Sequence, residues 1–395
     1  MSNKELGFDT RAIHSGGDKK EAHGALNPPI YQTSTFVFDS VAEAEDTFSF
    51  RSDGYVYTRG RNPTLTVFEE RMAALEEGVA AVSFASGMAA ITSVLLSLLR
   101  RGDEVVAHRT LYGSSYNVLA NILPDYGIIT HFVDLTDPAR LGAAINDKTR
   151  VVYFETPSNP DLSLVDIERT AQIAHAAGAK VVVDNTIATP YFQRPLALGA
   201  DVVVHSATKY ISGHGDVVAG VAVSNDADYA HRLRFGYMAE FGGVLAPFNA
   251  WLLVRGLKTL GLRMRQHEAN ARQVAAYLAE HPAVTQVLYP GLPDFPQHDL
   301  ASRQMSGYGA IVSFEVRGGE RAAKAVIDRV RLVTLAVSLG DAETLIEHPV
   351  TMTHRGFPRA DLALYGLSPG LIRLSVGLEN AADIIADLEQ ALAGM

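Results

Sequence analysis

The chain has 395 residues, of which 47% are hydrophobic and 20% charged, and its formal net charge is −10. This balance is typical of a soluble globular protein, and the length favours two domains because a single core rarely grows beyond about 300 residues. The acidic balance, without any run of Lys and Arg, argues against nucleic-acid and anionic-membrane partners, and the absence of cysteine excludes disulfides, thiolate nucleophiles and Cys-ligated zinc.

The longest apolar stretch, Ala89–Leu99, is shorter than the roughly 18 residues needed to span a bilayer. Residues Met1–Asp9 contain no apolar core of a signal peptide. We therefore expect a cytoplasmic protein that does not enter a membrane.

Residues 1–62 predict an irregular, extended N-terminal segment, because turn signals such as Asn27-Pro28-Pro29 recur along it. A helix is then expected to begin at Asn62, a capping residue, with Pro63 at its first position. Apolar residues at helical spacing continue this helix as far as Gly78.

Residues 63–250 predict a large α/β domain. Strand and helix patterns alternate here, which favours a mostly parallel sheet with helices on both faces. Near-continuous Val runs are typical of strands buried on both faces. The expected strands are 81–85, 104–108, 128–133, 150–155, 180–184, 201–205 and 217–223, and the helices between them include 87–99, 137–146 and 165–178.

Residues 251–395 predict a smaller α+β domain. One long helical region is expected from about residue 248 to 280, and a final helix covers 381–392. Between them lie the strand candidates 310–316, 331–337 and 371–376.

Two Val-rich strands of the large domain end in an acid and a lysine. Asp184 closes one strand, and Lys209 follows the next one. Ligands bind beyond the carboxyl ends of parallel strands, where both side chains should lie. Pyridoxal 5'-phosphate needs this pair, since a lysine amine forms a Schiff base with it and a carboxylate keeps its ring nitrogen protonated. A surface lysine and a helix-capping Asp are an equal alternative for the two residues alone.

A phosphate-binding site is predicted where strand 81–85 turns into a helix. Backbone N–H groups at a helix N-terminus bind anions, and Gly87 lets the backbone approach closely. Met88 follows it, and Ser206 and Thr208 could add hydroxyl groups. A simple turn is the alternative interpretation of the Ser-Gly pair.

Other polar and aromatic residues follow strands or lie in loops. Tyr57 and Arg59 suit a phosphate, although a solvated loop is the simpler interpretation. Tyr112 follows strand 104–108 and could stack on an aromatic cofactor or act as an acid, if it is not merely packed in a loop. Asn159 lies just past strand 150–155, in a possible turn.

Arg373 lies inside an apolar strand, where a guanidinium requires an anionic partner. A substrate α-carboxylate is one candidate, with Ser338 near it in function, and an internal salt bridge is an equal alternative. The thirteen histidines show no His-Glu-x-x-His spacing, and no Gly-x-Ser-x-Gly motif occurs. We therefore expect neither a metal site nor a serine hydrolase.

Together these motifs resemble the Cys/Met-metabolism family of pyridoxal-phosphate enzymes. The resemblance runs from Thr10–His14 to Ser375–Glu379 and is most specific between Val183 and Tyr210. It implies a type I aminotransferase-like fold. It also implies a homotetramer that is a dimer of dimers with shared active sites.

The resemblance further implies a role for each matching residue. Lys209 would carry the cofactor, Asp184 would pair with its ring nitrogen, and Tyr112 would stack on the ring and help to protonate the leaving group. The phosphate would be held by Gly87, Met88, Ser206 and Thr208, and by Tyr57 and Arg59 of a neighbouring subunit. The substrate would be bound by Arg373, Ser338, Asn159 and Tyr57, with Asn159 also contacting the ring hydroxyl.

Within the family, Ser338–Leu345 and Met352–His354 are similar to segments of methionine γ-lyases. This implies γ-elimination on L-methionine or homocysteine, which yields 2-oxobutanoate, ammonia and a thiol. Two places depart from that pattern, because Ser114 replaces a Cys and Met238-Ala239-Glu240 replaces Lys-Asp-Met. Cystathionine γ-lyase activity and γ-replacement by a cystathionine γ-synthase or an acylhomoserine sulfhydrylase stay open. Ser114 and the apolar Val337 are the predicted specificity residues.

Overall fold

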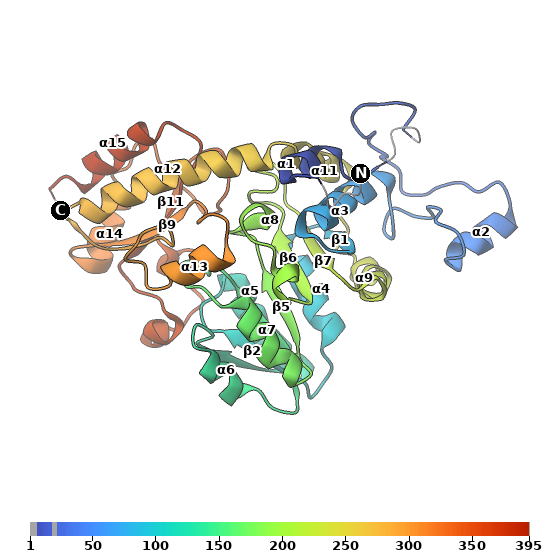
Figure 1. The fold of residues 1–395 in the computed structure, drawn as a ribbon, viewed down its shortest axis with the longest axis horizontal. Coiled ribbons are helices and arrows are strands. Elements are labelled where there is room, and N and C mark those ends of the chain that lie inside the picture. The colour runs from blue at the N-terminus through green and yellow to red at the C-terminus, as the bar shows by residue number, and fades with distance from the viewer. Residues whose placement is uncertain (1–5, 18–21, 395) are drawn as a thin grey trace.

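A computed structural model describes residues 6–17 and 22–394, so parts of the predicted first and last segments lie outside the described residues. The described chain forms an elongated molecule with two sheets (Figure 1). Figure 1 also shows a long helix, α12, running between the part that contains the larger sheet and the part that contains the smaller one. No described helix has the length and apolar character required to cross a membrane.

The larger sheet has seven strands in the order β1-β7-β6-β5-β4-β2-β3. Strand β7 is antiparallel to β1 and β6, and the other neighbouring pairs are parallel, which confirms the mostly parallel sheet. The strands are β1 Ala80–Phe84, β2 Glu104–His108, β3 Ile129–Val133, β4 Thr149–Glu155, β5 Lys180–Asp184, β6 Val202–Ser206 and β7 Gly220–Ser224.

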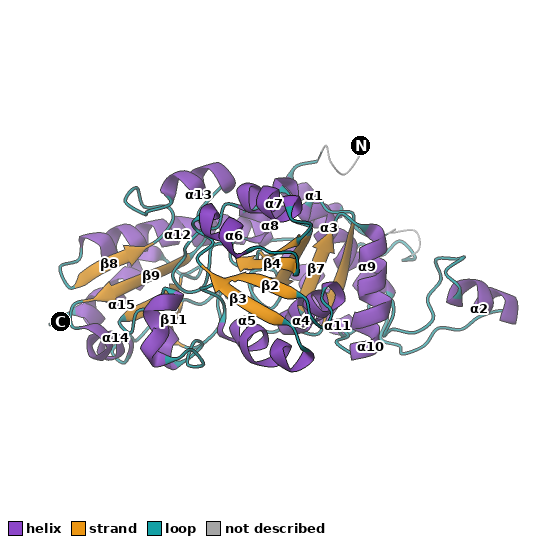
Figure 2. Ribbon diagram, turned by 90° about the horizontal axis from the view of Figure 1, so that it is seen from below, coloured by secondary structure: helices purple, strands orange, loops and turns teal. Residues whose placement is uncertain are grey.

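Helices cover both faces of this sheet, as predicted (Figure 2). Successive side chains of a strand point to opposite faces, so a strand without polar alternation must be buried twice. In β5, Val181 and Val183 pack in one hydrophobic core with α3 (Pro63–Glu76), whereas Val182 packs in a second core with α4 (Gly87–Leu98).

The N-terminal segment is less irregular than predicted, because it contains α1 (Phe8–His14) and α2 (Val41–Phe48). The side chain of Ser40 caps α2 by accepting the N–H of Glu43 at 3.1 Å, and the Glu43 carboxylate accepts the N–H of Asp39. These bonds follow the Ser-x-x-Glu spacing of a helix start, although Glu43 binds the N–H one residue before the cap. The turn signals of the segment obscured this pattern. Figure 1 shows α2 projecting away from the rest of the molecule.

The second sheet has five strands in the order β10-β11-β12-β9-β8. The predicted helical region from 248 to 280 is two helices, because the last turn of α11 tightens into i→i+3 bonds that end it at residues 258–259. The predicted strand 331–337 is reduced to β10, since the Asp387 carboxylate takes the N–H groups of residues 331–333. The elements are α11 Pro247–Leu257, α12 Leu260–Glu280, β8 Val284–Leu288, β9 Ile311–Val316, β10 Thr334–Leu335, β11 Leu345–Glu347 and β12 Leu371–Ser375.

The strands of the larger sheet lie within residues 80–224, and those of the smaller sheet within residues 284–375. We therefore propose a large domain (63–250) and a smaller one (251–395). Helix α11 crosses that boundary. The remaining α-helices are α5 Gly113–Asn117, α6 Pro138–Ala144, α7 Ile167–Ala176, α8 Thr189–Phe192, α9 Ala227–Leu233, α10 Ala239–Phe241, α13 His298–Gln304, α14 Gly319–Ile327 and α15 Ala381–Leu392.

Candidate functional site

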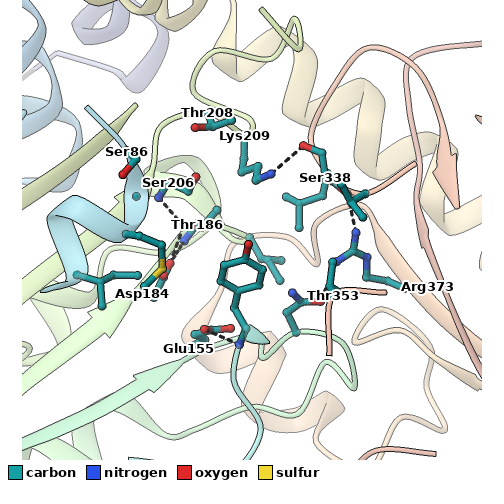
Figure 3. A pocket seen from close by; sticks show the side chains of 18 of the residues that line it. Ser86, Glu155, Asp184, Thr186, Ser206, Thr208, Lys209, Ser338, Thr353 and Arg373 are labelled. Carbon is teal, nitrogen blue, oxygen red and sulfur yellow. Dashed lines mark hydrogen bonds between the residues drawn. The ribbon is translucent and has the colours of Figure 1, made fainter. Parts of the chain in front are cut away.

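A cavity of about 690 Å³ gathers most of the predicted site residues (Figure 3). It lies beyond the carboxyl ends of β4, β5 and β6 and is closed from the other side by segments of the C-terminal part. The predicted residues that line it are Gly87, Met88, Tyr112, Asn159, Asp184, Ser206, Thr208, Lys209, Val337, Ser338 and Arg373. The residues Tyr57, Arg59 and Ser114 do not line it.

Asp184 and Lys209 lie at the ends of neighbouring parallel strands, as the sequence predicts. One carboxylate oxygen of Asp184 accepts the N–H of Thr186 at 3.0 Å and its hydroxyl at 2.5 Å. Burial raises the pKa of Asp184, although the hydrogen bonds from Thr186 act in the opposite direction. A buried carboxyl with one oxygen held in this way is suited to a cationic partner in the cavity.

The Lys209 amine donates to the Ser338 hydroxyl at 2.7 Å (Figure 3). Burial lowers the pKa of Lys209 to about 8, and the charge of Arg373 acts in the same direction. Near neutral pH, the uncharged and therefore nucleophilic fraction of this amine is larger than that of a solvated lysine.

Gly87 begins α4 against the Ser206 side chain. A Cβ atom at Gly87 would lie 2.9 Å from the Cβ of Ser206, so the backbone approaches too closely for any larger residue. Ser86 caps the helix by accepting the N–H of Ala89 at 3.0 Å. The first N–H groups of α4 therefore lie at the cavity wall, where an anion would bind.

Ser206 and Thr208, the two residues predicted to offer hydroxyl groups to the phosphate, are both tied to neighbouring segments. Thr208 Oγ1 lies 3.2 Å from the backbone oxygen and 3.0 Å from the backbone nitrogen of Ala219, so its hydroxyl is engaged with the chain. The backbone N–H of Ser206 donates to the Thr186 hydroxyl at 2.8 Å, which ties it to the residue that holds Asp184.

Arg373 on β12 is buried, and its guanidinium is held by contacts within the chain. Its Nη1 atom lies 2.9 Å from Glu347 Oε1, so the internal salt bridge exists. It also donates to the Asn159 side chain at 3.0 Å and to the Ser338 backbone oxygen at 2.5 Å. Its Nε group is buried without a hydrogen-bond partner among the described residues, although the side chain lines the cavity.

Tyr112 precedes α5 and is anchored by its backbone rather than by its ring. Its N–H donates to Glu155 Oε1 at 2.8 Å. The Tyr112 side chain is 38% exposed and lines the cavity, which suits a ring that covers a ligand. Ser114, two residues later in α5, stays outside the lining.

Tyr57 and Arg59 lie in the N-terminal segment. The guanidinium of Arg59 lies over the Tyr57 ring at 5.6 Å and donates to the backbone oxygen of Ala239 at 3.3 Å. Both side chains are about half exposed, so they can contact a molecule outside this chain.

Sequence reasoning missed Glu155, Thr186 and Glu347. Glu155 ends β4 at the same sheet edge as Asp184, a position that the strand pattern alone could have indicated. Thr186 lies two residues after Asp184, in Asx-turn spacing. Nothing in the sequence pairs Glu347 with Arg373, because the two residues meet only through the register of β11 and β12.

These groups fit pyridoxal 5'-phosphate. The cavity offers a lysine with a lowered pKa and a buried carboxyl with a free oxygen. It also offers a helix N-terminus whose glycine leaves no room for a Cβ, where a phosphate would bind, and a buried guanidinium with an unpaired Nε. Within the described residues, no group of three or more His, Cys, Asp or Glu is arranged to hold a metal ion.

Comparison with known proteins places the chain in a family. The model of the Cys/Met metabolism PLP-dependent enzymes matches residues 9–393. L-methionine gamma-lyase of Treponema denticola is 50% identical over 99% of both chains. Cystathionine gamma-synthase of Mycobacterium tuberculosis is 46% identical over 97% of this chain and 96% of its own.

A solved structure, that of metB from Corynebacterium glutamicum, superposes with a TM-score of 0.94 at 40% identity over 99% of both chains. This likeness confirms the fold class expected from the sequence. The resemblance seen in the sequence is confirmed as well, over nearly the whole chain. The chain therefore belongs to the Cys/Met-metabolism family of pyridoxal-phosphate-dependent enzymes.

Proposed function

We propose that the protein is a carbon–sulfur lyase that performs γ-elimination on a sulfur amino acid, L-methionine or homocysteine. The reaction consumes one water and gives 2-oxobutanoate, ammonia and a thiol, or hydrogen sulfide in the case of homocysteine. The observation that carries the proposal is the cavity that joins Lys209, Asp184 and Arg373. Half of the residues are identical to a full-length relative named L-methionine gamma-lyase, which supports the choice of reaction.

Lys209 and Asp184 would hold the cofactor, Lys209 by a covalent bond and Asp184 at the ring nitrogen. When bound, pyridoxal phosphate supplies a ring that accepts electrons from the substrate Cα. The amino group of the substrate would displace Lys209 from the cofactor, and the freed Lys209 amine would take the Cα proton. Its lowered pKa suits it to hold and release a proton near neutral pH. Ser338 orients the amine of Lys209 by the 2.7 Å hydrogen bond.

The phosphate would bind at the N-terminus of α4. Gly87 and Met88 would contribute N–H groups, and Ser206 and Thr208 hydroxyl groups. The close approach of Gly87 to Ser206 supports this, because it brings together the two segments that would hold the phosphate, which we call the phosphate cradle. Thr208 would have to turn its hydroxyl away from Ala219 to take part.

Arg373 would bind the substrate carboxylate, with Ser338 and Asn159 beside it. Its unpaired Nε supports the role, whereas Glu347 keeps the guanidinium in place. Tyr112 would cover the ring and donate a proton to the leaving sulfur, and Asn159 would contact the ring hydroxyl. Val337, Leu339 and Met352 line the same cavity and offer apolar contacts to a thioether.

Cystathionine γ-lyase activity and γ-replacement are the second candidate functions. The 46% identity to a cystathionine gamma-synthase supports γ-replacement. Glu240 in α10 lies 3.9 Å from Arg59, and both side chains are exposed, so this departure from the methionine γ-lyase pattern would affect the proposed contact with another subunit. Ser114 would act on specificity from outside the cavity lining.

We also propose a cytoplasmic homotetramer, built from dimers that share active sites. The projecting N-terminal segment exposes apolar side chains that suit burial against another copy, among them Val37, Val41, Phe48 and Phe50. Tyr57 and Arg59 would then reach the phosphate site of the neighbouring subunit, with Tyr57 also near its substrate.

The test is to incubate the purified protein with methionine, homocysteine, cystathionine and O-acetylhomoserine, with and without sulfide. The proposal predicts the highest kcat/KM for methionine or homocysteine, with 2-oxobutanoate and methanethiol formed from methionine, or 2-oxobutanoate and hydrogen sulfide from homocysteine. A higher kcat/KM for O-acetylhomoserine with sulfide would instead establish γ-replacement. A preference for cystathionine would establish cystathionine γ-lyase activity.

A further inference from the structure

Glu155 lines the cavity but has no part in the roles described above. It ends β4, and its side chain is buried, with the residue 5% exposed. In the parallel pairing of β4 and β5 it lies directly opposite Asp184. Figure 3 shows both carboxyl groups on the same side of the cavity.

Two buried carboxyl groups in one site cannot both be ionised without a large penalty, so a proton stays on one of them. Asp184 has His205 nearby and faces the expected ring nitrogen, and both favour its charged form. Burial and the charge of Asp184 raise the pKa of Glu155 well above its ordinary range, although hydrogen bonds from Tyr112, Asn159 and Ser115 act in the opposite direction. The neighbouring Tyr153 hydroxyl is buried too and provides no charge.

A hydrogen bond ties Glu155 to the Tyr112 backbone. Its Oε1 atom accepts the N–H of Tyr112 at 2.8 Å. This bond fixes the backbone at the point where the chain turns into α5. The position of the Tyr112 ring over the cavity therefore depends on Glu155.

We propose that Glu155 is a positioning residue which, as a neutral carboxylic acid, fixes the Tyr112 backbone and leaves Asp184 as the charged partner of the cofactor. The proposal rests on the cofactor-binding part of the proposed function and not on the choice of substrate.

Cofactor binding to the apoenzyme tests the positioning. Glu155→Ala removes the acceptor of a buried N–H group and should weaken pyridoxal-phosphate binding by about tenfold. Glu155→Gln is neutral, has the same shape and keeps an acceptor oxygen, so it should recover most of that loss. Glu155→Gln binding as weakly as Glu155→Ala would overturn the proposal, because the charge would then matter. Wild-type affinity in a folded Glu155→Ala would overturn it as well.

Infrared spectra of the holoenzyme test the protonation state directly and need no unstable variant. The proposal predicts the C=O band of a protonated carboxylic acid that Glu155→Gln removes. A spectrum in which Glu155→Gln removes only carboxylate bands would overturn it. Neither the binding experiment nor the infrared experiment uses a substrate, so both give a result even if the protein does not turn over methionine.

Discussion

Replacing Gly87 with Ala adds one methyl group to the phosphate cradle. The new Cβ would lie 2.9 Å from the Cβ and 3.0 Å from the Cα of Ser206. Carbon atoms in ordinary contact are about 3.5–4.0 Å apart, so Ser206 would have to move by roughly 0.6 Å or more. One of the two atoms that clash belongs to the backbone at the end of β6, which cannot rotate away.

The size of the effect follows from this geometry. Overpacking costs about 1–3 kcal/mol, and that part should appear as a lower free energy of unfolding of the apoenzyme. The displaced Ser206 hydroxyl would also lose the hydrogen bond that we propose it makes to the phosphate. A hydrogen bond to a charged group contributes about 1.5–3 kcal/mol, so the Kd for pyridoxal phosphate should rise about 10- to 150-fold.

The assay titrates the apoenzyme with pyridoxal phosphate and follows its visible absorption, with urea unfolding measured in parallel. Gly142→Ala in α6 is the matched control, because no atom lies within 4 Å of its added Cβ. It should stabilise the helix by about 0.5–1 kcal/mol and leave cofactor binding unchanged. If a folded Gly87→Ala variant had a Kd for the cofactor within about twofold of the wild-type value, the proposed phosphate site would be refuted.

Three further predictions concern other sites. Arg373→Ala should lower kcat/KM by more than about tenfold, mainly through KM, because the carboxylate contact is lost, and an unchanged kcat/KM would contradict the role. The rate of cofactor attachment to the apoenzyme should rise with pH through about 8, since the Lys209 amine is free only above its lowered pKa, and a rise centred near the ordinary lysine value would contradict it. Asp387→Ala should lower the free energy of unfolding by about 1–3 kcal/mol, because three N–H groups of residues 331–333 lose their acceptor. The variant should be less stable than the wild type only at pH values above the native pKa of Asp387. Burial opposes these N–H donors, but they hold that pKa below its ordinary value, so the stabilisation is complete above the unfolded pKa and is lost as the pH falls through the native one.

The sequence is a good guide where a residue's role is local. The Val runs of β5 and β6 predict strands buried on both faces, and the chain order then predicts that Asp184 and Lys209 share one edge of the sheet. The cap at Asn62 and the glycine at residue 87 are likewise local signals, and the structure has both helices.

The sequence is a poorer guide where distant segments meet. The Glu347–Arg373 pair depends on the register of β11 against β12, and the Glu155–Asp184 pair on that of β4 against β5. Strand propensity at residues 331–333 is overridden by Asp387, which lies more than fifty residues further along the chain. Such tertiary contacts outweigh the small energies of local propensity.

The most direct test of the account is to find which residue carries the cofactor. The holoenzyme is reduced with borohydride, which fixes a lysine-bound cofactor to its amine, and is then digested and analysed by mass spectrometry. We expect the cofactor mass on the peptide that contains Lys209, and neither this adduct nor the visible absorption band in Lys209→Ala. A cofactor fixed to another lysine, or a Lys209→Ala variant that keeps the band and its turnover, would overturn the assignment of Lys209.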